Sequence, residues 1–144
     1  MITAVDTNVL LDVFLADPRF GSASGQCLRE SLRIGAIVAC DSVWAETVAV
    51  FPAREDGEKT LRELGVRFSP MNQESAARAG IIWKQYRSGG GKRARIVADF
   101  LIGAHALVQC DRLLTRDRGF YAGFFKGLQV IDPSEWREAE RMRG

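Results

Sequence analysis

Short apolar runs alternate along the chain with longer segments whose apolar residues recur at helical spacing. The short runs predict five strands, at about residues 1–5, 36–40, 66–69, 112–115 and 128–131. The run at 36–40 shows no polar alternation, which is typical of a parallel strand covered on both faces. The pattern therefore favours an α/β fold with a mainly parallel sheet.

The segments between these runs predict helices, and their ends carry capping or breaking residues. They fall at about residues 8–15, 22–33, 42–51, 54–64, 72–86 and 96–110, with a further charged helix starting at Pro133. Residues 116–119 are expected to form a polar turn. Helices between parallel strands indicate a three-layer sandwich with right-handed crossovers. The order of the strands does not follow from the pattern.

Length and composition suit a single domain that spans residues 1–144, with 47% hydrophobic and 26% charged residues. A formal charge of +2 permits a polyanionic partner without requiring one. The apolar runs fall short of the roughly 20 residues that cross a bilayer, and no signal peptide is evident. We expect a cytoplasmic protein without membrane contact. Three widely spaced cysteines, Cys27, Cys40 and Cys110, predict reduced core thiols.

Four acidic residues are placed so that the fold would bring them together. Asp6 follows the first predicted strand, Glu46 lies in the first turns after the second, and Asp117 lies just past the fourth. The carboxyl ends of parallel strands meet at one edge of a sheet, where ligands bind. Asp99 lies among apolar neighbours that predict its burial, and a buried carboxylate needs a partner.

Carboxylates that converge repel one another, and without a cation some of them would be protonated. An ion that prefers oxygen ligands, Mg²⁺ or Mn²⁺, removes this conflict and suits phosphodiester hydrolysis. Taken singly, Asp6 is a helix cap, Glu46 a solvated helix residue and Asp117 a turn residue. Acids without this placement are expected at the surface, in turns or as caps. They are Asp12, Asp17, Asp56, Asp111 and Asp132.

The motifs around the four acids resemble those of the PIN-domain ribonucleases, in particular the VapC-type toxins of bacterial toxin–antitoxin pairs. In chain order they are VDTNVLLD at 5–12, SVWAE at 42–46, ADFLIGAHA at 98–106 and LLTRDRGFY at 113–121. The resemblance covers nearly the whole chain. It implies a PIN-like sandwich and a Mg²⁺- or Mn²⁺-dependent endoribonuclease that hydrolyses RNA with metal-activated water. It also implies a homodimer and a cognate antitoxin protein as partner.

The resemblance further assigns roles to individual residues. The metal ligands, which are also the catalytic residues, would be Asp6, Glu46, Asp99 and Asp117. Asn8 and Thr115 would support the site through hydrogen bonds. Basic residues near the site are candidates for contacts with RNA phosphates, or else form a solvated surface. They are Lys92, Arg93 and Arg95 in the Gly-rich segment 88–95, and Arg116 and Arg118 on either side of the last acid.

Two other functions remain open on the sequence. A phosphatase of the haloacid-dehalogenase type also begins with a strand that ends in Asp, but it usually has a second Asp where this chain has Asn8. A catalytically idle PIN-like module that binds RNA or protein belongs to a different class, and the intact set of four acids argues against it. The only histidine, His105, lies almost two helical turns from Asp99, so we expect it in the core or an interface rather than as a catalytic base.

Overall fold

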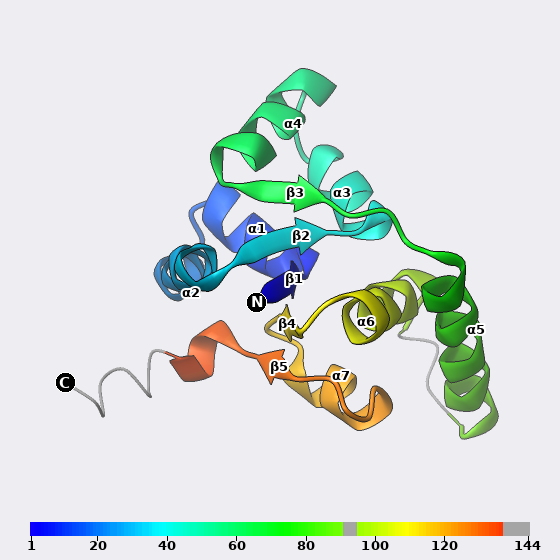
Figure 1. Ribbon diagram of the computed structural model, residues 1–144. Helices are drawn as coiled ribbons and strands as arrows, with labels where there is room; N and C mark the ends of the chain where they lie inside the picture. The colour runs from blue at the N-terminus through cyan, green and yellow to red at the C-terminus, as the bar shows by residue number, and fades with distance from the viewer. Residues whose placement is uncertain (91–94, 137–144) are drawn as a thin grey trace.

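The computed structural model describes residues 1–90 and 95–136 of the 144-residue chain. Within these ranges the central sheet consists of five strands. They are β1 (Ile2–Val5), β2 (Ala36–Ala39), β3 (Val66–Phe68), β4 (Arg112–Leu114) and β5 (Val130–Ile131). The strands are parallel, in the order β3–β2–β1–β4–β5 (Figure 1). β1 is therefore the central strand, and β2 and β4 flank it.

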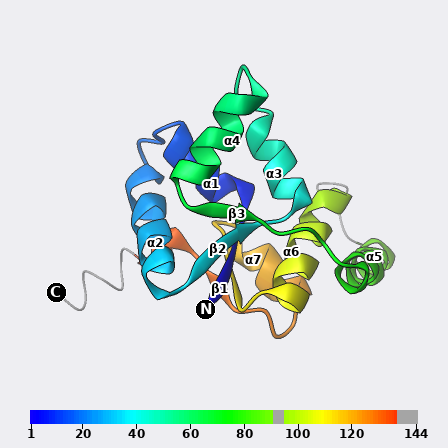
Figure 2. The same cartoon turned by 45° about the horizontal axis from the view of Figure 1, so that its top comes forward.

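Helices cover both faces of this sheet. The described ranges contain α1 (Thr7–Phe14), α2 (Gly21–Ile34), α3 (Asp41–Val48), α4 (Arg54–Glu63), α5 (Gln73–Ser88), α6 (Val97–Gln109) and α7 (Arg118–Phe124). In Figure 2, α1 and α2 lie on one side of the strands, and α5 and α6 lie on the other. The predicted three-layer sandwich around a parallel sheet is therefore confirmed.

Close packing between α6 and the end of α7 fixes two elements that carry predicted site residues. Phe100 of α6 and Phe125, directly after α7, are buried, and their ring centroids lie 6.3 Å apart. Gly103 makes this approach possible, because a Cβ at that position would lie 2.4 Å from Cζ of Phe125. The starts of α6 and α7 are consequently held in one arrangement around the carboxyl edge of the sheet.

The structure corrects one predicted element, the turn at residues 116–119. Two other predicted segments, the Gly-rich segment and the C-terminal helix, are described only in part. Residues 116–119 were expected to form a turn, but α7 begins at Arg118. Gly119 and Gly123 weaken the helical signal, and the helix is stabilised by tertiary burial of Phe120 and Tyr121. Residues 133–136 are helical as expected, whereas residues 137–144 and positions 91–94 of the Gly-rich segment lie outside the described residues.

His105 occupies the core position that the sequence predicts. Its side chain is 1% exposed, and Nε2 lies 2.9 Å from Oγ of Ser69. Burial lowers the pKa of His105, which favours the neutral imidazole. Cys27 and Cys40 are buried as expected, while Cys110 is half-buried. Over the described ranges, none of the helices combines the length and apolar character needed to span a membrane.

Candidate metal centre

Asp6, Glu46 and Asp99 act on one another electrostatically at the carboxyl edge of the sheet. Asp6 directly follows β1 and is 7% exposed. Its pKa is raised to about 6, chiefly by burial and to a smaller extent by the negative charges of Asp99 and Glu46. Burial also raises the pKa of Glu46, again with a contribution from Asp99. The fold has therefore placed Asp99 and Glu46 near enough to Asp6 for their charges to disfavour its ionised form.

Hydrogen bonds fix the Asp6 carboxylate in place. Oδ1 accepts a hydrogen bond from the backbone N–H of Thr7 at 2.7 Å, which also caps α1. Oδ2 accepts one from the Thr115 hydroxyl at 2.8 Å. The side-chain amide of Asn8 lies 3.4 Å from both Oδ2 of Asp6 and Oγ1 of Thr115. Asn8 and Thr115, the two residues expected to support the site through hydrogen bonds, thus both contact Asp6.

Glu46 is connected to Asp6 through Thr7, a residue that the sequence analysis did not select. Glu46 lies in α3, and its Oε1 accepts a hydrogen bond from Oγ1 of Thr7 at 3.2 Å. Thr7 therefore contacts Asp6 through its backbone and Glu46 through its side chain. Its position between Asp6 and Asn8 in the first motif was the available signal.

Asp99 lies in the first turn of α6 and caps that helix. Its Oδ2 accepts a hydrogen bond from the backbone N–H of Ile96 at 3.2 Å. A negative charge at this end also interacts favourably with the helix dipole. Asp99 is half-buried rather than buried, because α6 begins only at Val97 and its first turn stays near the surface. The apolar neighbours alone overstated its burial.

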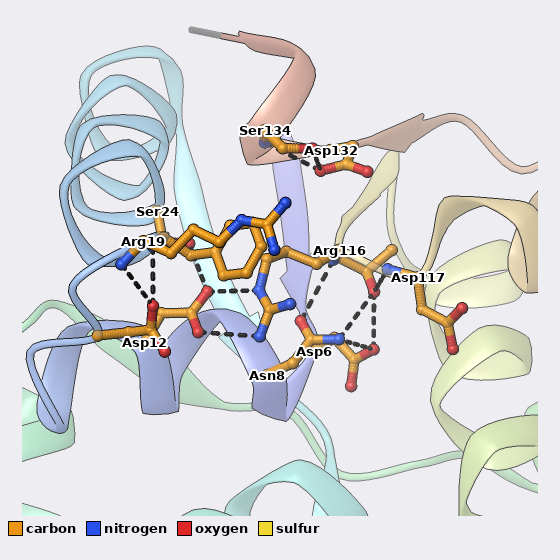
Figure 3. Close-up of polar contacts among 12 residues, drawn as sticks. Asp6, Asn8, Asp12, Arg19, Ser24, Arg116, Asp117, Asp132 and Ser134 are labelled. Atoms are coloured by element: carbon orange, nitrogen blue, oxygen red, sulfur yellow. Dashed lines mark hydrogen bonds and ion pairs between the residues drawn. The ribbon is translucent and has the colours of Figure 1, made fainter.

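Asp117 lies at the start of α7, but its carboxylate is directed to a different partner. Its backbone N–H donates to Oγ1 of Thr115 at 3.0 Å. Its Oδ2 accepts a hydrogen bond from Nη1 of Arg95, with which it forms an ion pair. Figure 3 shows the carboxylates of Asp117 and Asp6 lying apart. Across residues 1–90 and 95–136, no three side chains of the Asp, Glu, His or Cys types are close enough to hold a metal ion together.

Asp12 was expected at the surface, in a turn or as a cap, and this was wrong. It is 3% exposed and accepts hydrogen bonds from Nε and Nη2 of Arg116 at 2.7 and 3.0 Å (Figure 3). Ser24 donates to it at 2.9 Å, and the guanidinium of Arg116 lies 4.1 Å from the ring centroid of Phe20. Its place on the apolar helix VLLDVF was a signal of the same kind as that used for Asp99.

The basic residues that the sequence predicts as phosphate contacts lie in different surroundings. Arg95 lies beside Asp117, and Arg118 forms an exposed ion pair with Glu135. Lys92 and Arg93 lie outside the described residues. Arg116 reaches the site through its backbone, since its N–H donates to Oδ1 of Asn8 at 3.3 Å.

Several solved structures share this fold. One chain of VapBC2 from Rickettsia felis, bound to a DNA fragment from their promoter, matches with a TM-score of 0.72 and 17% identity, covering 92% of this chain and 98% of that one. A chain of VapBC-1 from nontypeable Haemophilus influenzae matches with a TM-score of 0.69 and 18% identity, covering 93% of this chain and 99% of that one. A chain of FitAcB from Neisseria gonorrhoeae matches with a TM-score of 0.63 and 23% identity, and the coverage is again 93% of this chain and 99% of that one. A comparison with curated protein sequences found no match.

A family model supplies the assignment that these distant structural similarities leave open. The model of the PIN domain matches residues 3–123, which include all four acids and the strands and helices that present them. Asn8 donates to Asp6 rather than supplying a second acid, so the phosphatase alternative gains no support from the site. The chain belongs to the PIN domain family.

Proposed function

We propose that this protein is a metal-dependent endoribonuclease that hydrolyses RNA phosphodiesters and acts as the toxin of a toxin–antitoxin pair. The observation that carries the proposal is the burial of Asp6 within reach of the charges of Glu46 and Asp99, which together raise its pKa to about 6. Acids that disfavour one another's charge gain stability from a shared cation. Membership of the PIN family supports the nuclease class.

The donor set fits Mg²⁺ or Mn²⁺ by its chemistry, because it offers carboxylate oxygens alone. Asp6, Glu46, Asp99 and Asp117 would hold the ion. Once bound, such an ion lowers the pKa of a water molecule and neutralises phosphate charge. Thr115 and Asn8 orient the Asp6 carboxylate, and Thr7 orients that of Glu46.

Positive charge for the RNA backbone would come from the arginines and the lysine near the acids. Arg95 has a partly exposed side chain beside Asp117, Arg118 has an exposed one paired with Glu135, and Lys92 and Arg93 precede Arg95 in the sequence. Arg116 is bound to Asp12 by two hydrogen bonds. We therefore assign it the positioning of the 115–117 turn in place of a phosphate contact.

Similarity to chains of the VapBC and FitAcB structures supports an antitoxin protein as the partner of this chain. An antitoxin that covers the acidic edge of the sheet would prevent RNA from reaching Asp6 and Asp99. The homodimer, the single domain over residues 1–144 and the cytoplasmic location stay predictions.

The proposed function is tested by replacing Asp6 and Asp99 separately with Asn. Each variant should remain folded, bind Mn²⁺ more weakly and cleave a labelled single-stranded RNA at least about 100-fold more slowly, which is the upper range for losing a residue that only supports a metal ligand. Asp56→Asn, an exposed acid of α4, is the matched control and should retain activity. Full cleavage by both site variants, or undiminished cleavage in EDTA, would contradict the proposal.

A further inference from the structure

We propose that Arg95 competes with the divalent cation for Asp117, so that the fourth acid is held out of the metal site until a cation displaces the guanidinium. This inference rests on the proposed metal-dependent function.

Two contacts hold the Arg95 guanidinium beside Asp117. Nη1 donates to Oδ2 of Asp117, and the guanidinium carbon lies 4.2 Å from the ring centroid of Phe120. Phe120 belongs to the same helix that Asp117 begins, so the cation–π contact and the ion pair are part of one local arrangement. The side chains of Arg95 and Asp117 are 28% and 35% exposed, which screens the pair from solvent only in part.

Asp6 is within electrostatic range of Asp99 and Glu46, whereas Asp117 is directed elsewhere. The charges of Asp99 and Glu46 act on Asp6, whereas the Asp117 carboxylate lies apart from Asp6 in Figure 3. Among the side chains that the structure describes, no three acids are close enough to share an ion. To share an ion with Asp6, the Asp117 carboxylate would have to turn toward it, and this rotation would break its bond to Arg95.

The other arginines around Asp117 do not have this contact. Arg116 is bound to the buried Asp12, and Arg118 pairs with Glu135. Arg95 should therefore affect cation binding through its direct bond to Asp117, an effect that a general excess of positive charge would not produce. Removing Arg95 should free the Asp117 carboxylate, whereas removing Arg118 should leave it paired as before.

Displacement of Arg95 also connects cation binding with RNA binding. A guanidinium released from Asp117 is available to a phosphate, and a phosphate that binds Arg95 leaves Asp117 available to a cation. Thermodynamic linkage requires the two effects to be equal, so RNA and cation should each strengthen the binding of the other.

The test is a Mn²⁺ titration, by calorimetry and by the electron paramagnetic resonance of free Mn²⁺, of the RNA-free protein. The variants are Arg95→Gln, Asp117→Asn, the double variant and Arg118→Gln as a charge-matched control. Arg95→Gln should bind Mn²⁺ about three- to fivefold more tightly, as expected for the loss of a competing, partly exposed ion pair. In the Asp117→Asn background the same substitution should raise affinity clearly less than in the wild type, because the acid for which Arg95 competes is gone and only the weaker effect of its charge on Asp99 is left. Arg118→Gln should also stay within about twofold of the wild type.

Unfolding curves of the metal-free variants will establish that each is folded. Equal Mn²⁺ affinities of the wild type and Arg95→Gln would overturn the inference and leave the metal site intact. So would a gain of the same size in the Asp117→Asn background or in Arg118→Gln, because it would reflect general electrostatics. A wild-type protein that binds no Mn²⁺ would overturn both this inference and the proposed function.

Discussion

Asp6 combines two effects that act on its ionisation in opposite directions. The hydrogen bonds from Thr115 and Thr7 favour the charged carboxylate, while burial and the neighbouring acids disfavour it. Burial is the larger effect, so the pKa rises from its ordinary value of 3.8 to about 6. The protein without metal therefore loses stability when this group ionises, and the folded state retains a site that a cation would stabilise.

The raised pKa of Asp6 predicts that Asp6→Asn changes the stability of the metal-free protein, in EDTA, by an amount that depends on pH. Because the folded-state pKa of Asp6 is raised, its stabilising contribution to the folded state is fully present below about pH 4, where the group is protonated. This contribution is lost as the pH rises through about 6. Asn does not ionise, so the variant should gain stability relative to the wild type between pH 4 and 7, by up to about 3 kcal/mol. Urea unfolding at each pH measures the difference.

Asp17→Asn is the control of opposite sign. Backbone N–H groups of Phe20 and Arg19 lower the pKa of Asp17, so its contribution is present above the ordinary pKa and is lost as the pH falls. That variant should lose stability relative to the wild type toward neutral pH. A difference between Asp6→Asn and the wild type that does not change with pH would show that Asp6 ionises in the folded protein as it does in the unfolded chain.

Individual site residues were predictable where the contact is local or set by the strands. Asp6 and Thr115 follow neighbouring parallel strands, so the hydrogen bond between them agrees with the strand-end argument. The partner of Asp117 was not predictable, because Arg95 precedes α6 and reaches Asp117 only through the packing of α6 against α7. Asp12 was misjudged because its pairing with Arg116 depends on the same kind of distant contact.

At the scale of elements, the turn from β4 to α7 is attached to α1 and α2. Arg116 lies in that turn, and its partner Asp12 lies in α1 and accepts a further hydrogen bond from Ser24 of α2. Thr115 and Asp117 flank Arg116, so the ion pair also positions two residues of the site. Five strands and six helices followed from periodicity, but α7 and the strand order did not, because tertiary packing and non-local pairing decide them.

The ion pair between Arg116 and Asp12 predicts that Arg116→Ala lowers the free energy of unfolding by about 2–4 kcal/mol at pH 7, as measured by urea unfolding. Asp12 would then remain as a buried charge without its cation. Combining it with Asp12→Asn should restore part of this loss, since the uncompensated charge is then removed. Arg33→Ala, which breaks a surface pair with Glu30, should leave stability little changed. Additive losses in the double variant would show that the two side chains act independently.

For the molecule as a whole, charge is nearly balanced, with 20 basic and 18 acidic residues. A net charge of +2 gives little long-range attraction for RNA. Binding must therefore depend on local groups of cations, and the sequence places three of them, Lys92, Arg93 and Arg95, shortly before Asp99. Such binding should depend on salt according to the number of phosphates contacted.

Replacing Lys92, Arg93 and Arg95 together with Ala should therefore weaken RNA binding and flatten its salt dependence. Each lost contact with single-stranded RNA reduces the slope of log affinity against log salt by about 0.7, so three contacts reduce it by about 2. The measurement is the affinity for a labelled RNA across a salt series in saturating Ca²⁺, which suppresses cleavage. Saturation also keeps the proposed effect of Arg95 on cation affinity out of the comparison.

The matched control replaces three cations on the helices that lead into β2 and β3, at the opposite edge of the sheet. They are Arg33 of α2 and Lys59 and Arg62 of α4. Both triple variants lose the same formal charge, so a general electrostatic effect would flatten both slopes equally. A direct contact with RNA flattens only the slope of the Lys92, Arg93 and Arg95 variant. Equal slopes in that variant and the wild type would show that these residues form a solvated surface, and the RNA backbone would then have to be bound nearer Arg118.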